Sequence, residues 1–203
     1  MANLLYVPIL HTQKEVGKIA SAISSANTPI PAKQEKSSSA SPLVKMWQGI
    51  QGKIEVLNPP WKKVRIYQEA LPVCGQEERI VSHLAKNSLN HQLIVKFLKR
   101  GAHLEGTEEQ NLLLREYDLL AHAFQAAEGK TSMTAYRNAS ETILADRDQF
   151  IAQRVKQTLK EEETGLLFIG VRHKVDQLLK QDYQMTYVIY RLPFETVHSI
   201  YNL

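Results

Sequence analysis

The stretch Gly165-Leu-Leu-Phe-Ile-Gly-Val-Arg-His173 decides how this sequence folds. Residues 166–171 form an unbroken apolar run, rich in branched and aromatic side chains, that favours a strand buried on both faces. Gly170 within the run lets another backbone or a ligand approach closely. His173 follows the run, where ligands of open α/β sheets bind, beyond the carboxyl ends of the strands. The stretch predicts a central strand that delivers a reactive histidine, and a histidine that only caps the strand is the alternative.

Further strands and helices alternate along the chain. Strand patterns occur at 4–10, 63–68, 102–105 and 185–191. Helical periodicity occurs at 43–57, 75–87, 90–100, 108–127, 132–162 and 174–180, and in a segment that starts at Thr12. Strands separated by helices predict a single α/β domain over residues 1–203, with a mainly parallel central sheet flanked by helices.

Two local features qualify this pattern. Residues 27–42 are rich in serine and proline, which predicts a flexible insert within the domain. Thr107 and Gln110 have the spacing of a capping box, which predicts that Thr107 caps the helix that follows.

Composition limits the classes of function. Hydrophobic residues make up 43% of the chain and charged residues 23%, as in a globular protein. The net charge of +4 is mild and dispersed, so binding to nucleic acid is not indicated. Cys74 is the only cysteine, which excludes an internal disulfide and favours the cytoplasm. The sequence shows neither a secretory signal nor 18 consecutive apolar residues, so we expect no membrane association.

Ionisable side chains stand at the predicted carboxyl ends of four strands. These residues are His11, Glu69, Glu105 and His173. The carboxyl ends of parallel strands share one edge of a sheet, so these four side chains are predicted to meet there. Each acidic residue alone is explained equally well as a cap of the following helix. It is their joint occurrence that predicts a site.

Two kinds of chemistry suit such a set. Neutral imidazoles and carboxylates are ligands for a divalent transition metal, which lowers the pKa of a bound water. Alternatively, one histidine held by a carboxylate acts as a general base on water, and the second histidine acts as the acid. The sequence contains no closely spaced pair of histidines or cysteines that would decide between them.

The order of these motifs resembles the TraB/GumN/Tiki family, which is in turn similar to erythromycin esterases and ChaN-like proteins. The resemblance is carried by Pro8-Ile-Leu-His11, Tyr67-Gln-Glu69, Leu104-Glu-Gly-Thr-Glu-Glu-Gln110, Asp146-Arg-Asp148 and Gly170-Val-Arg-His173. It is strongest between residues 147 and 179. Two positions depart from the family pattern, because Pro8 replaces a glycine and Asp148 replaces an asparagine.

The resemblance implies a site made of His11, Glu69, Arg147 and His173, with Glu105 beside them. It implies metal-dependent peptidase activity as in the Tiki members, with His11, Glu69 and His173 as ligands, or metal-independent ester hydrolysis as in the esterases. The ChaN-like proteins add haem as an alternative cofactor. For Arg147 the resemblance implies a role in holding a carboxylate, although an arginine in a polar helix is ordinarily exposed.

Three functional hypotheses follow. The first is a hydrolase that acts on a small molecule or a peptide, in which His11 or His173 activates water and Arg147 stabilises the oxyanion. The second is a protein that binds haem, a metal or a small anion on the same scaffold without catalysis. The third is an interaction module. The sequence leaves homo-oligomerisation open.

Overall fold

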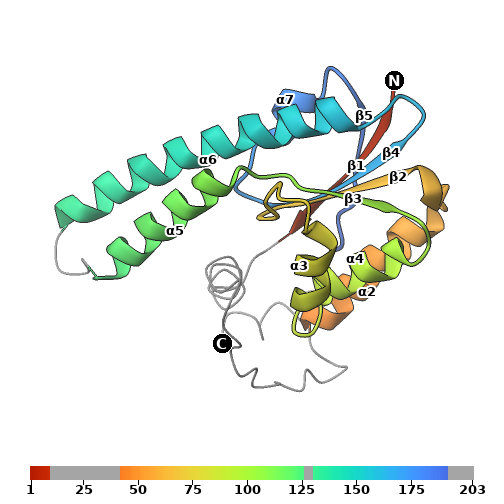
Figure 1. The fold of residues 1–203 in the computed structure, drawn as a ribbon, viewed down its shortest axis with the longest axis horizontal. Helices are drawn as coiled ribbons and strands as arrows, with labels where there is room; N and C mark the ends of the chain where they lie inside the picture. Colours follow the sequence, from red (N-terminus) through yellow and green to blue (C-terminus); the bar gives the residue numbers. More distant parts are fainter. Residues whose placement is uncertain (10–41, 126–129, 192–203) are drawn as a thin grey trace.

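The computed structural model describes residues 1–9, 42–125 and 130–191, and of residues 120–125 and 130–135 it describes the backbone alone. Five strands form one sheet in the order β3-β2-β4-β1-β5 (Figure 1). They are β1 (Asn3–Ile9), β2 (Val64–Gln68), β3 (His103–Glu105), β4 (Thr164–Gly170) and β5 (Gln184–Tyr187). All four strand pairs are parallel, which confirms the predicted fold class.

The stretch quoted at the start of the sequence analysis forms the central strand, β4. β4 pairs with β1 from Asn3 opposite Thr164 to Ile9 opposite Gly170, and with β2 on its other side. Its side chains are buried on both faces of the sheet from Gly165 to Gly170. β1, β2 and β4 therefore end close together at the carboxyl edge.

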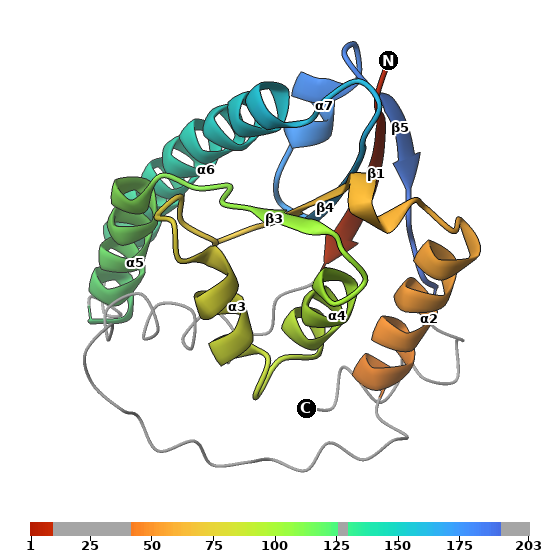
Figure 2. The ribbon, with the colours of Figure 1, turned by 45° about the vertical axis from the view of Figure 1, so that its right-hand side comes forward.

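Helices cover both faces of the sheet (Figures 1 and 2). On one face lie α2 (Pro42–Val56), α3 (Glu77–Leu84) and α4 (Leu89–Leu98). On the other lie α6 (Lys130–Thr158) and α7 (Val175–Leu179). α5 (Gln110–Gln125) packs along α6, and a 3₁₀ turn (Trp61–Lys63) precedes β2.

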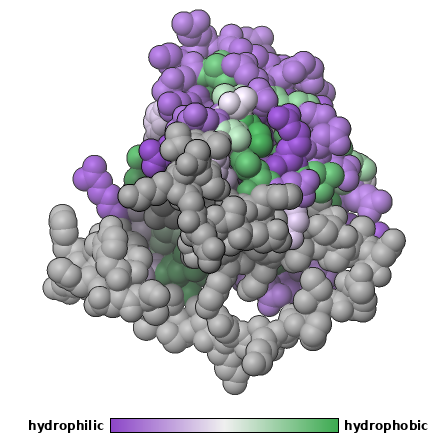
Figure 3. Space-filling model, turned by 90° about the vertical axis from the view of Figure 1, so that its left-hand side faces the viewer, coloured by the Kyte–Doolittle hydropathy of each residue, from purple (hydrophilic) through white to green (hydrophobic). Residues whose placement is uncertain are grey.

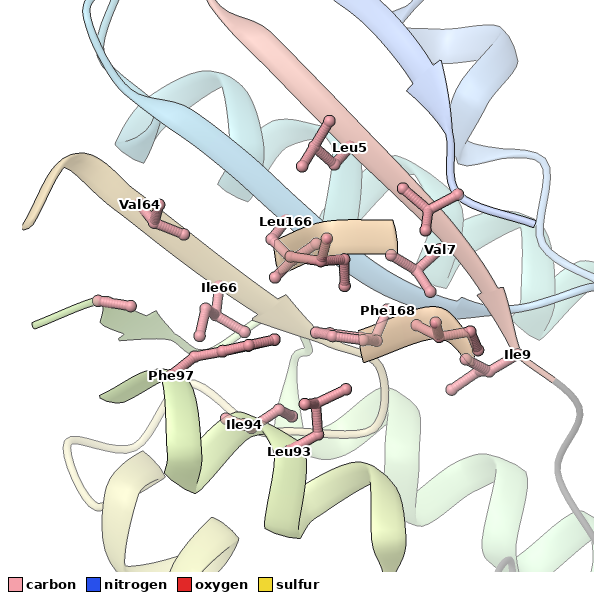
Figure 4. Close-up of a cluster of buried hydrophobic side chains, with 14 of the residues drawn as sticks. Leu5, Val7, Ile9, Val64, Ile66, Leu93, Ile94, Phe97, Leu166 and Phe168 are labelled. Atoms are coloured by element: carbon pink, nitrogen blue, oxygen red, sulfur yellow. The ribbon is translucent and has the colours of Figure 1, made fainter. Parts of the chain in front are cut away.

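Alternating residues of the strands supply two separate hydrophobic cores. On the face of α2 and α4, Ile66 and Phe168 pack against Phe97 and its neighbours (Figure 4). On the opposite face, Leu167 and Ile169 pack against α6 and α7. Period-two alternation along a strand sends neighbouring side chains to opposite faces, so one strand serves both cores.

α6 has 29 residues, which makes it about 44 Å long. Its C-terminal part packs on the sheet through Ile151 and Val155. Its N-terminal part runs beside α5, and together they project beyond the sheet as a helical hairpin (Figure 1). Arg147 and Asp148 lie next to the part of α6 that covers the sheet.

Viewed from the side of this hairpin, hydrophilic residues cover most of the described surface, with smaller hydrophobic areas between them (Figure 3). None of the helices in the described ranges is both long and apolar enough to span a bilayer.

Several predictions from the sequence fall outside the described residues. They concern His11, the helix that starts at Thr12 and residues 27–41 of the predicted insert. They stay predictions.

Candidate functional site

Glu69 follows β2 directly and lies at the carboxyl edge of the sheet. Its backbone N–H donates to the carbonyl of Phe168 at 3.0 Å, which extends the pairing of β2 with β4 by one residue. The backbone N–H of Gly170 donates to Oε2 of Glu69. The predicted strand ends therefore meet here, and the end of β4 holds the carboxylate that follows β2.

His173 joins this carboxylate from the turn after β4. Its Nε2 lies 2.9 Å from Oε1 of Glu69, and its Nδ1 lies 2.5 Å from Oδ1 of Asp148 on α6. The side chain is only 2% exposed. A backbone hydrogen bond of 3.0 Å from His173 N to Gly170 O closes the turn that carries the ring. The imidazole is thus held between two carboxylates.

Two opposing effects set the pKa of His173. Burial lowers it, because burial disfavours the charged form. The hydrogen bonds to Asp148 and Glu69 favour the charged form, and with them the pKa of His173 rises from 6.5 to about 9. Only the charged imidazolium carries a proton on each ring nitrogen, so only this form can donate to both carboxylates at once.

Arg147 binds the same carboxylate from α6. Its Nη2 lies 3.4 Å from Oε1 of Glu69. The same guanidinium donates two hydrogen bonds to the carboxylate of Glu108, from Nε at 3.0 Å and from Nη2 at 2.7 Å. Its Nη1 donates to Glu116 on α5 at 2.6 Å. Burial opposes the charge of Arg147, but the three glutamates outweigh this effect and raise its pKa. Arg147 is therefore a buried cation.

Glu108 also holds the turn that follows Glu69. Its Oε1 accepts a hydrogen bond of 3.2 Å from the backbone N–H of Ala70. Ala70 has a φ of 61°, in the left-handed region that residues with a Cβ rarely adopt. Glu108 is fully buried, so the strained turn and the arginine share one buried anchor.

Glu105, which the sequence analysis placed in the site, lies in a different ionic network. Its carboxylate pairs with Arg65 of β2 and, at 3.4 Å, with Arg154 of α6. Arg154 lies about two helical turns from Arg147, because seven residues separate them. Glu105 is the last residue of β3. The position beside Arg147 that was predicted for Glu105 is taken by Glu108, three residues further on.

The predicted metal ligands were His11, Glu69 and His173. In the part of the chain that the structure describes, no group of three or more acidic, histidine or cysteine side chains could hold a metal ion. His173 as placed does not fit a ligand of a metal or of haem iron, because both of its nitrogens bind carboxylates. His11 lies outside the described residues, so its role stays a prediction.

Sequence reasoning missed Asp148, Glu108 and Glu116. Asp148 and Glu108 both belong to motifs that carry the family resemblance, so their place in these motifs could have indicated that they belong to the site. Glu116 carried no signal, because a glutamate in a polar helix is usually a solvated charge. Thr107 was also misread as the cap of α5, because α5 begins at Gln110 and Glu109 directly precedes it. The hydroxyl of Thr107 donates to Gln68 O at 2.5 Å.

Comparison of the chain with protein-family models, with curated proteins and with solved structures finds no match. The family resemblance of the motifs stays a prediction.

The cluster combines two cations, His173 and Arg147, with three carboxylates that are fully or largely buried. These carboxylates belong to Glu69, Glu108 and Asp148. Glu69 lies at its centre, because His173, Arg147 and a backbone N–H all converge on it. Such an arrangement can pass a proton between His173 and Glu69, and it can stabilise negative charge that develops beside the two cations.

Proposed function

We propose that this protein is a hydrolase of esters or peptides whose active site is the cluster of His173, Glu69 and Arg147. The observation that carries the proposal is the convergence of His173 and Arg147 on a single oxygen of Glu69, at 2.9 and 3.4 Å. The cluster lies at the carboxyl edge of a parallel sheet, which is the usual position of a ligand site in this architecture. The positive φ of the adjacent Ala70 adds local strain, which is typical of functional sites.

In the proposed reaction, water attacks the carbonyl carbon of the substrate. Negative charge then develops on the carbonyl oxygen, and the cations of His173 and Arg147 stabilise it. His173, protonated at neutral pH, passes a proton across its hydrogen bond to Glu69, which delivers it to the leaving group. The base that accepts the proton of the attacking water is His11, one of the two histidines that the sequence analysis gave as alternatives for this role.

We place this activity in the cytoplasm. The chain has one cysteine, Cys74, and the structure shows it as a free, exposed thiol. An exposed free thiol is typical of proteins from a reducing compartment.

The test is hydrolysis of a panel of chromogenic acyl esters and short peptides by the purified protein. We expect turnover of at least one class, and a loss of about 100-fold or more in kcat/KM in the Glu69→Gln and His173→Gln variants. The His11→Ala variant tests the predicted base in the same assay.

The matched control is Glu163→Gln. Glu163 also pairs with an arginine, Arg65, but it directly precedes β4 at the opposite end of the sheet. Its removal should leave kcat/KM unchanged. Equal activity of Glu69→Gln and the wild type would contradict the proposal. Binding of a panel compound without turnover would favour the non-catalytic alternative.

A further inference from the structure

We propose that Asp148 is a positioning residue that holds His173 in one orientation and in its doubly protonated form, so that His173 serves the site as a cation and proton donor. This excludes His173 from the role of general base. The catalytic consequence depends on the proposed function, whereas the charge state of the imidazole does not.

The geometry leaves Asp148 little freedom. It lies on α6 beside Arg147 and is buried. Its Oδ1 binds Nδ1 of His173 at 2.5 Å, and its Oδ2 accepts a hydrogen bond of 2.8 Å from the backbone N–H of Lys174. One carboxylate therefore fixes both the ring and the backbone that follows it. Rotation of the imidazole would break at least one charge-assisted hydrogen bond.

The second carboxylate completes the assignment of protons. A carboxylate only accepts hydrogen bonds when it is ionised, so a nitrogen that binds it must carry a proton. Asp148 requires a proton on Nδ1 and Glu69 requires one on Nε2. A neutral imidazole carries only one proton, so it satisfies one of these carboxylates and leaves the other without its donor.

Other elements around the ring also bear charged or titratable groups. Arg147 opposes the charge of His173. Burial raises the pKa of Tyr6 of β1, and the carboxylates of Asp176, Asp148 and Glu69 raise it further, which keeps its hydroxyl neutral. The two carboxylates therefore decide the state of the ring.

The experiment is an NMR pH titration of the imidazole nitrogens, with the His173 signals identified by their loss in His173→Gln. In the wild type we expect both nitrogens protonated at pH 7 and a titration near pH 9. In Asp148→Asn the carboxylate charge is lost, and the titration should move down by about one pH unit or more. Asp148→Glu restores the charge and should move it back towards the wild-type value.

Asp176→Asn is the matched control, because Asp176 lies on α7, three residues after His173 in the sequence, but accepts a hydrogen bond from the hydroxyl of Tyr187. It should leave the titration of His173 within a few tenths of a pH unit of the wild type. A neutral ring in the wild type at pH 7, or an unchanged titration in Asp148→Asn, would overturn the inference. The wild-type spectrum decides the charge state even where a variant does not fold.

The activity assay separates the inference from the proposed function. If the protein is a hydrolase, the limb of the pH profile that falls at high pH should follow the titration of His173, and Asp148→Asn should shift both downwards together. A titration near pH 9 in a protein without hydrolase activity would support the inference about Asp148 and contradict the proposed function alone.

Discussion

Single residues set the direction of the side chains in this cluster. Ala70 reverses the chain directly after Glu69 with a φ of 61°. Hydrogen bonds from Ala70 N to Glu108 and from Leu71 N to Gln68 O hold the reversal, at 3.2 and 3.3 Å. An alanine in the left-handed region costs about 1–2 kcal/mol, and the surrounding hydrogen bonds offset this cost.

Ala70→Gly should therefore stabilise the protein. Glycine adopts this φ without strain, although it also gains entropy in the unfolded chain, so we expect a net rise of about 0.5–1 kcal/mol in the free energy of unfolding. Urea denaturation measures it. Ala102→Gly is the control, because Ala102 does not have a positive φ and its replacement should lower the free energy of unfolding. Equal destabilisation by both substitutions would show that the turn is unstrained.

At the scale of elements, α6 joins the two halves of the cluster. Arg147 and Asp148 are neighbours on this helix, and they contact Glu108 and His173, which come from loops on either side of it in the sequence. The pair of Arg147 with Glu108 also connects α6 to the loop before α5. A buried ion pair is costly to break, because the remaining charge has no comparable partner.

Glu108→Leu and Arg147→Met should each lower the free energy of unfolding by about 3–5 kcal/mol. The double variant should lose less than the sum of the two, because it removes both charges together. Urea denaturation of the four proteins gives the coupling energy. Glu162→Gln, in the exposed pair with Lys63, is the control and should have no measurable effect. Strict additivity would contradict a direct interaction.

At the scale of the whole molecule, the cluster makes stability depend on pH. His173 has a pKa of about 9 in the folded protein and about 6.5 when unfolded. Between these values the folded state binds the proton and the unfolded state does not, so stability falls as pH rises. The contribution of His173 is complete below about pH 6.5 and is lost through pH 9.

We expect the wild type to lose about 3 kcal/mol of unfolding free energy between pH 6 and pH 10 through His173. Urea denaturation at several pH values measures the slope, and His173→Gln should lack this part of it. Parallel curves for the two proteins would show that His173 does not gain a proton on folding.

Much of the fold could be predicted from the sequence. The apolar run in β4 and the helical periodicity of α2 and α6 are local patterns, and local burial preferences decide them. The position of Glu69 after β2 and that of His173 after β4 follow from the same patterns. The parallel sheet follows from the alternation of strands with helices.

The membership of the cluster depended on the tertiary structure. Glu105 and Glu108 are three residues apart with the same chemistry, and only the path of the loop after β3 decides which of them meets Arg147. Arg147 has the surroundings of an exposed helical charge in sequence, yet it is buried and binds Glu69 and Glu108, which are distant from it in the sequence.

The sequence by itself determined the class of fold and the edge of the sheet at which polar groups gather, because both follow from periodicities within short segments. The tertiary structure alone decided that Asp148 and Glu69 enclose His173 and keep it charged. A hydrogen bond depends on a few tenths of an ångström, and residues 69, 148 and 173 reach that precision only through the packing of α6 on the sheet.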